Sequence, residues 1–198
     1  MINMKAIESV VIVGSSATGK STLVDSLRKP EYDDRVVIPN RYITRPPRLN
    51  DNTSENTHIS HAQFQDGVER GVIVPYWMRP MGESRRERYG FNIVADNDDR
   101  LRIYSANNAF LRHPNDSTRS VLETGLVVVV AAQTAVRDRR LNERSPDMGE
   151  AERALRLDDD GADIPDTHDR VEIINTTGMT PIQGQVAFEG LIGQILHA

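Results

Sequence analysis

The fold of this chain is decided by the stretch Val10-Val11-Ile12-Val13-Gly14-Ser15-Ser16-Ala17-Thr18-Gly19-Lys20-Ser21. Four β-branched apolar residues in a row are typical of a buried strand, and Leu23, Val24 and Leu27 are spaced as on one face of a helix. A glycine-rich turn between a buried strand and the start of a helix aims several backbone N–H groups at one anion. The stretch therefore predicts a phosphate-binding loop, with glycines where the backbone must come close to the phosphate.

Each position of this loop has an expected role in binding a nucleotide. Lys20 is expected to reach the β- and γ-phosphates, Ser21 to hold Mg²⁺ through its hydroxyl, and Thr22 to open a helix over residues 21–27. The alternative is a chance match to a short pattern, and the strand and helix on either side argue against it. The predicted nucleotide-binding residues are Gly14, Ser15, Ser16, Ala17, Thr18, Gly19, Lys20, Ser21 and Thr22.

Length and composition limit the class of protein. The 198 residues, 38% of them hydrophobic and 27% charged, suffice for one globular domain with a buried core. A formal net charge of -5 argues against a nucleic-acid binder, which usually carries a positive excess, and favours a small-molecule partner. The lack of cysteine excludes disulfides and zinc–thiolate sites and suits a reducing compartment. No apolar stretch approaches a membrane span or a signal core, so we expect a cytoplasmic protein without membrane contact.

Strand-like and helix-like segments alternate along the chain. The predicted strands cover residues 9–13, 35–38, 71–76, 100–105, 126–131 and 171–175, and the predicted helices cover 21–27, 61–69, 108–111, 134–143, 149–157 and 181–196. Runs that are apolar throughout, such as residues 126–130, suit a parallel sheet buried on both faces by helices. The expected fold is an α/β three-layer sandwich of the P-loop type with a mainly parallel sheet.

Two stretches interrupt this alternation. Residues 39–97 are expected to form a small substrate-binding subdomain, and the arginine-rich residues 137–164 a helical lid. The core of the single domain would then consist of residues 1–38, 98–136 and 165–198. Within the subdomain, residues 78–88 contain Arg85, Arg86 and Arg88, which form either a second phosphate site or an exposed loop.

Several motifs resemble the guanylate-kinase-like family of P-loop phosphotransferases. Besides the P-loop they are Arg41-Tyr42-Ile43-Thr44-Arg45-Pro46-Pro47-Arg48, Glu55-Asn56-Thr57-His58-Ile59-Ser60 with Phe64, Tyr89-Gly90, Arg140-Leu141 with Arg144, Arg156-Leu157, and Ile174-Asn175 with Gly178. The resemblance implies a kinase that uses ATP and Mg²⁺ on a small phosphorylated acceptor. Within the family, the residues from Arg41 to Pro46 with His58-Ile59, and Ile174-Asn175 with Gly178, are most similar to members that convert ribose 1,5-bisphosphate to phosphoribosyl diphosphate.

The resemblance also implies which residues bind the acceptor. They are Arg41, Arg45, Arg48, Tyr89, Ser105 and Asn107, although Ser105 and Asn107 match the family only in part. Arg45 and Arg48 lie three apart in a segment stiffened by prolines, and two guanidinium groups so placed can clamp a phosphate. Tyr89 would donate its hydroxyl to the same phosphate. The alternative for Arg45 and Arg48 is a solvated loop with surface charge.

The expected catalytic residues are Lys20, Arg140, Arg144 and Arg156. Phosphoryl transfer depends mainly on positioning and on neutralising the charge of the transferred group, which arginines of a lid can do. The alternative is that the lid arginines are helix-surface charges paired with Glu143, Glu150 or Glu152. Asn175 is expected beside the adenine by family analogy, or else is an ordinary turn residue at a strand end.

The chain departs from guanylate kinase itself where the guanine base would be read. Guanylate kinases carry a glutamate after the strand that here covers residues 72–76, and no carboxylate occurs between Arg70 and Arg79. Donors of a buried guanine would stay unpaired, so GMP is disfavoured. The alternatives are a kinase for GMP or an unusual nucleotide, and a non-catalytic binding module, against which the intact Lys20 and Ser21 argue. We expect a monomer or a homodimer.

Overall fold

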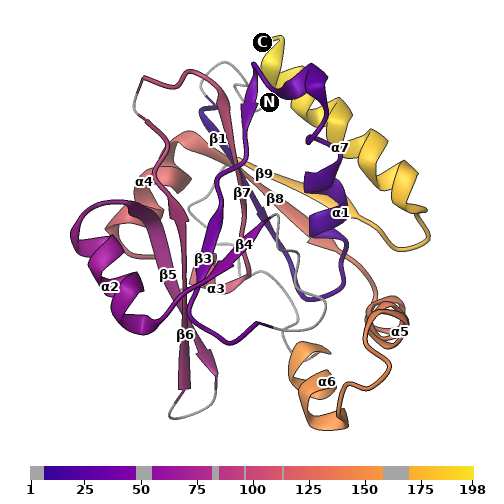
Figure 1. Ribbon diagram of the computed structural model, residues 1–198. Coiled ribbons are helices and arrows are strands. Elements are labelled where there is room, and N and C mark those ends of the chain that lie inside the picture. Colours follow the sequence, from indigo (N-terminus) through magenta and orange to yellow (C-terminus); the bar gives the residue numbers. More distant parts are fainter. Residues whose placement is uncertain (1–6, 48–54, 82–84, 96, 113, 158–169) are drawn as a thin grey trace.

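The centre of the molecule is a five-stranded sheet in the order β2-β7-β1-β8-β9 (Figure 1). The computed structural model describes residues 7–47, 55–81, 85–95, 97–112, 114–157 and 170–198. The strands of this sheet are β1 (Ser9–Val13), β2 (Val36–Val37), β7 (Leu101–Ser105), β8 (Gly125–Ala131) and β9 (Val171–Asn175). All of its strand pairs are parallel, as predicted.

Strand β1 lies in the middle of the sheet and is fully buried. The chain leaves β1 for β2 and β7 on one side and later crosses to β8 and β9 on the other. In α/β sheets of this kind, ligands bind at the carboxyl end of the strand where the winding changes side. The glycine-rich loop predicted to bind phosphate begins at that end of β1.

Helices cover both faces of this sheet. On one face, α1 (Lys20–Asp25) and α7 (Pro181–Leu196) pack with Val10 and Ile12 into a core that includes Leu23 and Phe188. On the other face, Val11 and Val13 belong to a second core with side chains of α3 (Ala109–Arg112) and α4 (Asp116–Thr124). Because successive strand residues point to opposite faces, β1 serves both cores. The predicted three-layer sandwich is confirmed.

A second sheet, in the order β4-β3-β6-β5, lies between β2 and β7 in the sequence. Its strands are β3 (Arg41–Ile43), β4 (Asn56–His58), β5 (Ile73–Met81) and β6 (Arg85–Asn92). Helix α2 (His61–Glu69) covers it, with the ring of Phe64 edge-on to that of Tyr76. Trp77 stacks on Tyr89 and meets Phe110 of α3 edge-on, which joins this sheet to the core. The subdomain boundaries at residues 39 and 97 stay a prediction.

Residues 78–88 are described except at 82–84, and a second phosphate site at Arg85, Arg86 and Arg88 stays a prediction. They belong to the hairpin of β5 and β6, whose strands pair from Trp77 with Tyr89 to Met81 with Arg85. The outward Arg88 donates from Nη1 to Gln65 Oε1 at 2.8 Å. The described parts of the stretch are therefore two paired strands on either side of residues 82–84, which lie outside the described residues, and the loop of the second alternative does not form in those parts.

The remaining elements are short or lie at the edge of the sandwich. A 3₁₀ turn covers Pro30–Tyr32, and the helices α5 (Thr134–Arg144) and α6 (Glu150–Leu157) lie side by side at the lower right of Figure 1. The predicted ends shift slightly, since α1 ends at Asp25 and β5 runs on to Met81. No helix in the described part of the chain is long and apolar enough to cross a membrane.

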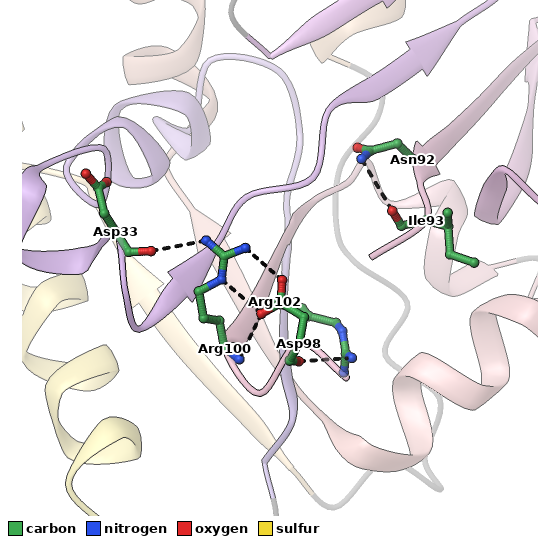
Figure 2. Close-up of polar contacts among 6 residues, drawn as sticks. All are labelled: Asp33, Asn92, Ile93, Asp98, Arg100 and Arg102. Atoms are coloured by element: carbon green, nitrogen blue, oxygen red, sulfur yellow. Dashed lines mark hydrogen bonds and ion pairs between the residues drawn. The ribbon is translucent and has the colours of Figure 1, made fainter. Parts of the chain in front are cut away.

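The amino-terminal end of β7 is fixed by an ion pair (Figure 2). Arg100 donates from Nε to Asp98 Oδ1 at 2.9 Å and from Nη2 to Asp98 Oδ2 at 2.7 Å. These bonds lower the pKa of Asp98 to about 2. Nη1 of Arg100 donates to the carbonyl oxygen of Asp33 at 3.1 Å, just before β2. The ion pair therefore holds the segment that returns from the second sheet to β7 next to the residues that lead into β2.

Candidate active site

The loop after β1 has backbone conformations that few residues adopt. Gly14 has φ 147, Gly19 has φ 104 and Ala17 has φ 62. A Cβ on Gly14 would collide with the carbonyl oxygen of Val130 on β8, so this position requires glycine. For Ala17 the left-handed conformation costs roughly 1–2 kcal/mol. Strain of this kind persists where surrounding structure enforces it, typically at ligand-binding sites.

The loop is wrapped around the ammonium group of Lys20. Its Nζ donates to the carbonyl oxygens of Gly14 at 2.5 Å and Ser15 at 2.9 Å. The hydroxyl of Thr18 also donates to the Ser15 carbonyl, at 3.0 Å. These bonds place the one cation of the loop within the turn itself, where a phosphate held by the loop would meet it.

Arg140 of α5 binds the loop from outside. Its Nη1 donates to the carbonyl oxygens of Ala17 at 3.2 Å and Thr18 at 3.3 Å, and to Thr176 Oγ1 at 3.0 Å. The C=O and N–H of a trans peptide point in opposite directions. Carbonyls directed at Arg140 therefore leave the N–H groups of Thr18 and Gly19 directed away from it, as a phosphate-binding loop requires.

Thr176 joins the end of β9 to the same loop, a role that the sequence did not predict. It is buried, and its Oγ1 lies 2.8 Å from the carbonyl oxygen of Thr18 and 3.2 Å from that of Ala131. Its own carbonyl accepts from Arg140 Nη2 at 3.2 Å. Arg140 and Thr176 therefore act together on the carbonyl side of the loop.

A buried carboxylate lies beside Ser21. The hydroxyl of Ser21 donates to Glu55 Oε2 over a long 3.4 Å, and Glu55 is only 5% exposed. Burial raises the pKa of Glu55, although the charge of nearby Arg41 acts against this. Among the described residues nothing hydrogen-bonds its other oxygen, Oε1. A hydroxyl and a carboxylate are ligands that suit Mg²⁺, so Ser21 and Glu55 fit a site for that ion.

Arg41 ties the second sheet to the core. Its Nε donates to Asn56 Oδ1 at 2.9 Å, and its Nη1 donates to the carbonyl oxygen of Ser105 at 2.6 Å. A small cavity under the junction is lined by Val24, Ile38, Pro39, Arg41, Glu55, Phe91 and Ser105. The structure thus brings the predicted acceptor residues Arg41 and Ser105 together, next to Glu55.

The hydroxyl of Tyr89 faces a carboxylate. It donates to Glu87 Oε2 at 2.5 Å, and both side chains are buried. Burial raises the pKa of Tyr89, and the negative charge of Glu87 adds to the effect, so the hydroxyl stays a donor. By family analogy a base-reading carboxylate would lie between Arg70 and Arg79, a stretch that has none. Glu87 was not predicted, although it lies opposite Arg79 in the register of the hairpin.

Two other predicted acceptor residues, Arg45 and Asn107, make hydrogen bonds within the protein. Arg45 donates from Nη1 to the carbonyl oxygen of Pro46, and its own carbonyl accepts from His58 Nδ1 at 2.8 Å. Arg48 lies outside the described residues, so the phosphate clamp stays a prediction. Asn107 Oδ1 accepts from Trp77 Nε1 at 3.1 Å and from the N–H of Ala109 at 3.0 Å.

Two asparagines differ in their relation to the loop. Asn108 is fully buried and donates from Nδ2 to Ser15 Oγ at 3.4 Å, a contact that the sequence did not predict. Asn175 is exposed and accepts from the N–H of Thr177 at 3.0 Å, which is the turn that the alternative interpretation expects at a strand end. Its place beside an adenine stays a prediction.

The predicted lid arginines lie in different surroundings. Arg144 is the exposed last residue of α5. Arg156 of α6 donates from Nη2 to Glu152 Oε1 at 2.7 Å, the helix-surface pair of the alternative interpretation, yet its side chain is only 12% exposed. Its Nε is buried and has no hydrogen-bond partner in the described ranges. Arg137, which was not predicted, is the more deeply buried arginine of this region.

Two bacterial proteins named ribose 1,5-bisphosphate phosphokinase PhnN are similar to this chain. The one from Dickeya zeae (strain Ech586) is 29% identical over 146 residues, which cover 74% of this chain and 73% of that protein. The one from Methylobacterium radiotolerans is 36% identical over 69 residues, which cover 34% of this chain and 38% of that protein. No protein-family model matches the chain.

Among solved structures, a guanylate kinase from Anaplasma phagocytophilum has a similar fold. Its TM-score is 0.54 at 11% sequence identity, with 96% of this chain and 84% of that chain covered. At so low an identity the likeness concerns the fold alone. The strained loop around Lys20, the parallel sheet with β1 at its centre and the sequence similarity agree with one another. The chain is an enzyme, an ATP-dependent kinase whose fold resembles that of guanylate kinase and whose sequence resembles the proteins named ribose 1,5-bisphosphate phosphokinase.

Proposed function

We propose that this enzyme transfers the γ-phosphoryl group of ATP to a small phosphorylated acceptor, ribose 1,5-bisphosphate, giving phosphoribosyl diphosphate and ADP. The observation that carries the transfer is the loop of residues 14–21, folded around Lys20 and bound from outside by Arg140. The choice of acceptor is supported by the similarity to the two PhnN proteins. An oxygen of the acceptor phosphate forms the new bond to phosphorus, and the bond to ADP breaks.

The nucleotide side of the reaction is assigned to the loop. Its N–H groups and Lys20 would hold the phosphates. Ser21 and Glu55 would hold Mg²⁺, which neutralises charge on the phosphate oxygens when it is bound. An acceptor phosphate is already ionised at neutral pH, so the transfer needs no strong general base. Arg140, Arg144 and Arg156 are proposed to stabilise the transferred group, Arg140 also by holding the loop.

The acceptor side is assigned to the junction of the two sheets. Arg41 and Ser105 meet there next to Glu55, Tyr89 comes from the second sheet, and Arg45 lies two residues after its strand β3. We also propose ATP and Mg²⁺ as the cofactors and a cytoplasmic location, which the absence of cysteine supports. The proposed functional unit is a monomer or a homodimer.

One observation favours a second candidate function, a nucleoside monophosphate kinase. Glu87 supplies a buried carboxylate next to Tyr89 on the second sheet. A carboxylate in that place could accept from the N–H groups of a base, which the stretch from Arg70 to Arg79 cannot do. The acceptor must therefore be identified by experiment.

The experiment is a screen for ADP release with Mg-ATP and purified protein. The acceptors are ribose 1,5-bisphosphate, other sugar phosphates and the common nucleoside monophosphates, and Lys20→Ala is the blank. Turnover with ribose 1,5-bisphosphate alone supports the proposal. Robust turnover with GMP would instead favour the second candidate and assign Glu87 to reading the base.

A further inference from the structure

Arg137 of α5 carries a charge that is only 2% exposed. Such a charge persists in the interior only where hydrogen bonds replace its water. Three of the acceptors are backbone carbonyls. Nε donates to Ser16 at 3.1 Å, and Nη2 donates to Arg156 at 2.8 Å and to Leu157 at 3.2 Å.

These carbonyls belong to two separate parts of the site. Ser16 lies in the phosphate-binding loop, whereas Arg156 and Leu157 are the last two residues of α6. The final carbonyls of a helix have no partner within it and attract a cation. One guanidinium group therefore completes the end of α6 and fastens it to the loop. A lysine would serve both ends less well, because its ammonium is a compact charge whereas the guanidinium is a rigid fork with donors on separate nitrogens.

Arg137 therefore holds the backbone of Arg156 to the phosphate-binding loop. The Arg156 side chain is mostly buried, is held by Glu152 and keeps a buried Nε without a partner among the described residues. We infer that Arg137 is a positioning residue that sets the place of Arg156 relative to the phosphate-binding loop. The inference rests on the proposed function, in which Arg156 stabilises the transferred phosphoryl group. Misplacement of such a group by about 1 Å can cost about 10²-fold in rate.

The matched pair of variants is Arg137→Met and Arg139→Met. Arg139 lies on the same helix, but its side chain is 69% exposed and its pair with Glu143 is long, at 3.8 Å. With the acceptor found by the screen, Arg137→Met should lower kcat by about 10²-fold. Nucleotide affinity, measured with a fluorescent ATP analogue, should fall by a smaller factor than kcat, because Arg137 makes one bond to the loop whereas Arg140 makes two. Arg139→Met should leave both unchanged, and an unchanged kcat in Arg137→Met overturns the inference.

A double-mutant cycle tests whether Arg137 acts through Arg156. Arg156→Met alone should slow the reaction, and adding Arg137→Met should cost little more, because the positioned group is already gone. If the double variant is instead slowed by the product of the two single factors, the inference is overturned. That result would mean that Arg137 contributes to the rate by a separate route.

Hydrogen exchange gives a readout that needs no acceptor. Without substrate, the backbone amides of α6 should exchange faster in Arg137→Met than in the unmodified protein and in Arg139→Met. Equal exchange in all three overturns the inference, even if the kinase reaction is confirmed. Failure of every acceptor would instead count against the proposed function and leave this comparison valid. Should Arg137→Met not fold, Arg137→Lys takes its place, with a smaller rise in α6 exchange expected, and no rise overturns the inference.

Discussion

Ser21 and Glu55 meet across the boundary between the phosphate-binding loop and the second sheet, with the Ser21 hydroxyl donating to Glu55 Oε2 at 3.4 Å. The loop alone provides a hydroxyl for Mg²⁺, and the second sheet adds the carboxylate next to β4. Because the two groups come from different parts of the fold, a change in the position of the second sheet would also change the proposed metal site.

Glu55→Gln should weaken the binding of Mg²⁺ at the proposed metal site. The amide keeps the shape of the side chain but removes the negative charge that attracts Mg²⁺. We expect the Mg²⁺ concentration for half-maximal activity to rise about tenfold or more, as for other groups around a metal. A titration of MgCl₂ at saturating ATP measures this. An unchanged Mg²⁺ requirement would remove Glu55 from the metal site.

The same substitution should stabilise the protein at neutral pH. Burial raises the pKa of Glu55 above its value in the unfolded chain, so the folded state binds more protons between the two values. Stability from this group is therefore lost as pH rises from about 4.5 through the raised pKa. Glu55→Gln should raise the melting temperature at pH 7 and leave it nearly unchanged at pH 4. A lower melting temperature at pH 7 would contradict this.

Gly14→Ala should disrupt the loop itself. The new methyl group would collide with the carbonyl of Val130, and φ 147 adds strain of roughly 1–3 kcal/mol. We expect a lower free energy of unfolding in urea and loss of ATP binding. The control is Gly190→Ala on the exposed face of α7, where a Cβ meets nothing within 4 Å. That change should stabilise the helix by about 0.5–1 kcal/mol.

Tyr89→Phe should affect binding of the acceptor and leave binding of the nucleotide unchanged. It removes the hydroxyl and leaves the buried Glu87 without this donor, which costs roughly 1–3 kcal/mol of stability. If Tyr89 contacts the acceptor, the KM for the acceptor should rise while the affinity for ATP stays the same. Steady-state kinetics with each substrate varied in turn measure both. A change confined to stability would make Tyr89 and Glu87 a structural pair.

The core of the fold could be predicted because its signals are local. The strand at residues 9–13 and the loop behind it are a contiguous pattern, and the valine-rich apolar run of β8 favours a buried strand. The strands β3, β4 and β6 were missed because charged and polar residues interrupt them. In β6, Glu87, Tyr89 and Phe91 point inward while Arg86 and Arg88 alternate with them, and a buried glutamate hides that period.

Sequence spacing predicted residues of the candidate site only where they are close in sequence, whereas the distant Arg41, Ser105 and Arg140 were named from the family resemblance. Lys20 and Ser21 follow from the loop pattern, whereas the partners of the loop come from far away. Glu55 is 34 residues from Ser21, Asn108 is 93 from Ser15, and Thr176 is 158 from Thr18. Arg137 is 121 residues from Ser16 and stands among several other arginines. No spacing rule distinguishes it from exposed neighbours such as Arg139, since only the packing of α5 against the loop buries it.

Replacing Arg140 should mainly weaken ATP binding, whereas replacing Arg156 should mainly lower kcat. Arg140 donates to the carbonyls of Ala17 and Thr18, so Arg140→Met should loosen the N–H groups that face the phosphates and weaken ATP binding about tenfold or more. In the described residues the Arg156 side chain bonds Glu152 and makes no hydrogen bond to the loop, so Arg156→Met should mainly lower kcat. Binding of an ATP analogue and single-turnover rates distinguish the two. Loss of kcat alone in Arg140→Met would mean that the loop keeps its shape without Arg140, and that this arginine acts on the transferred group directly.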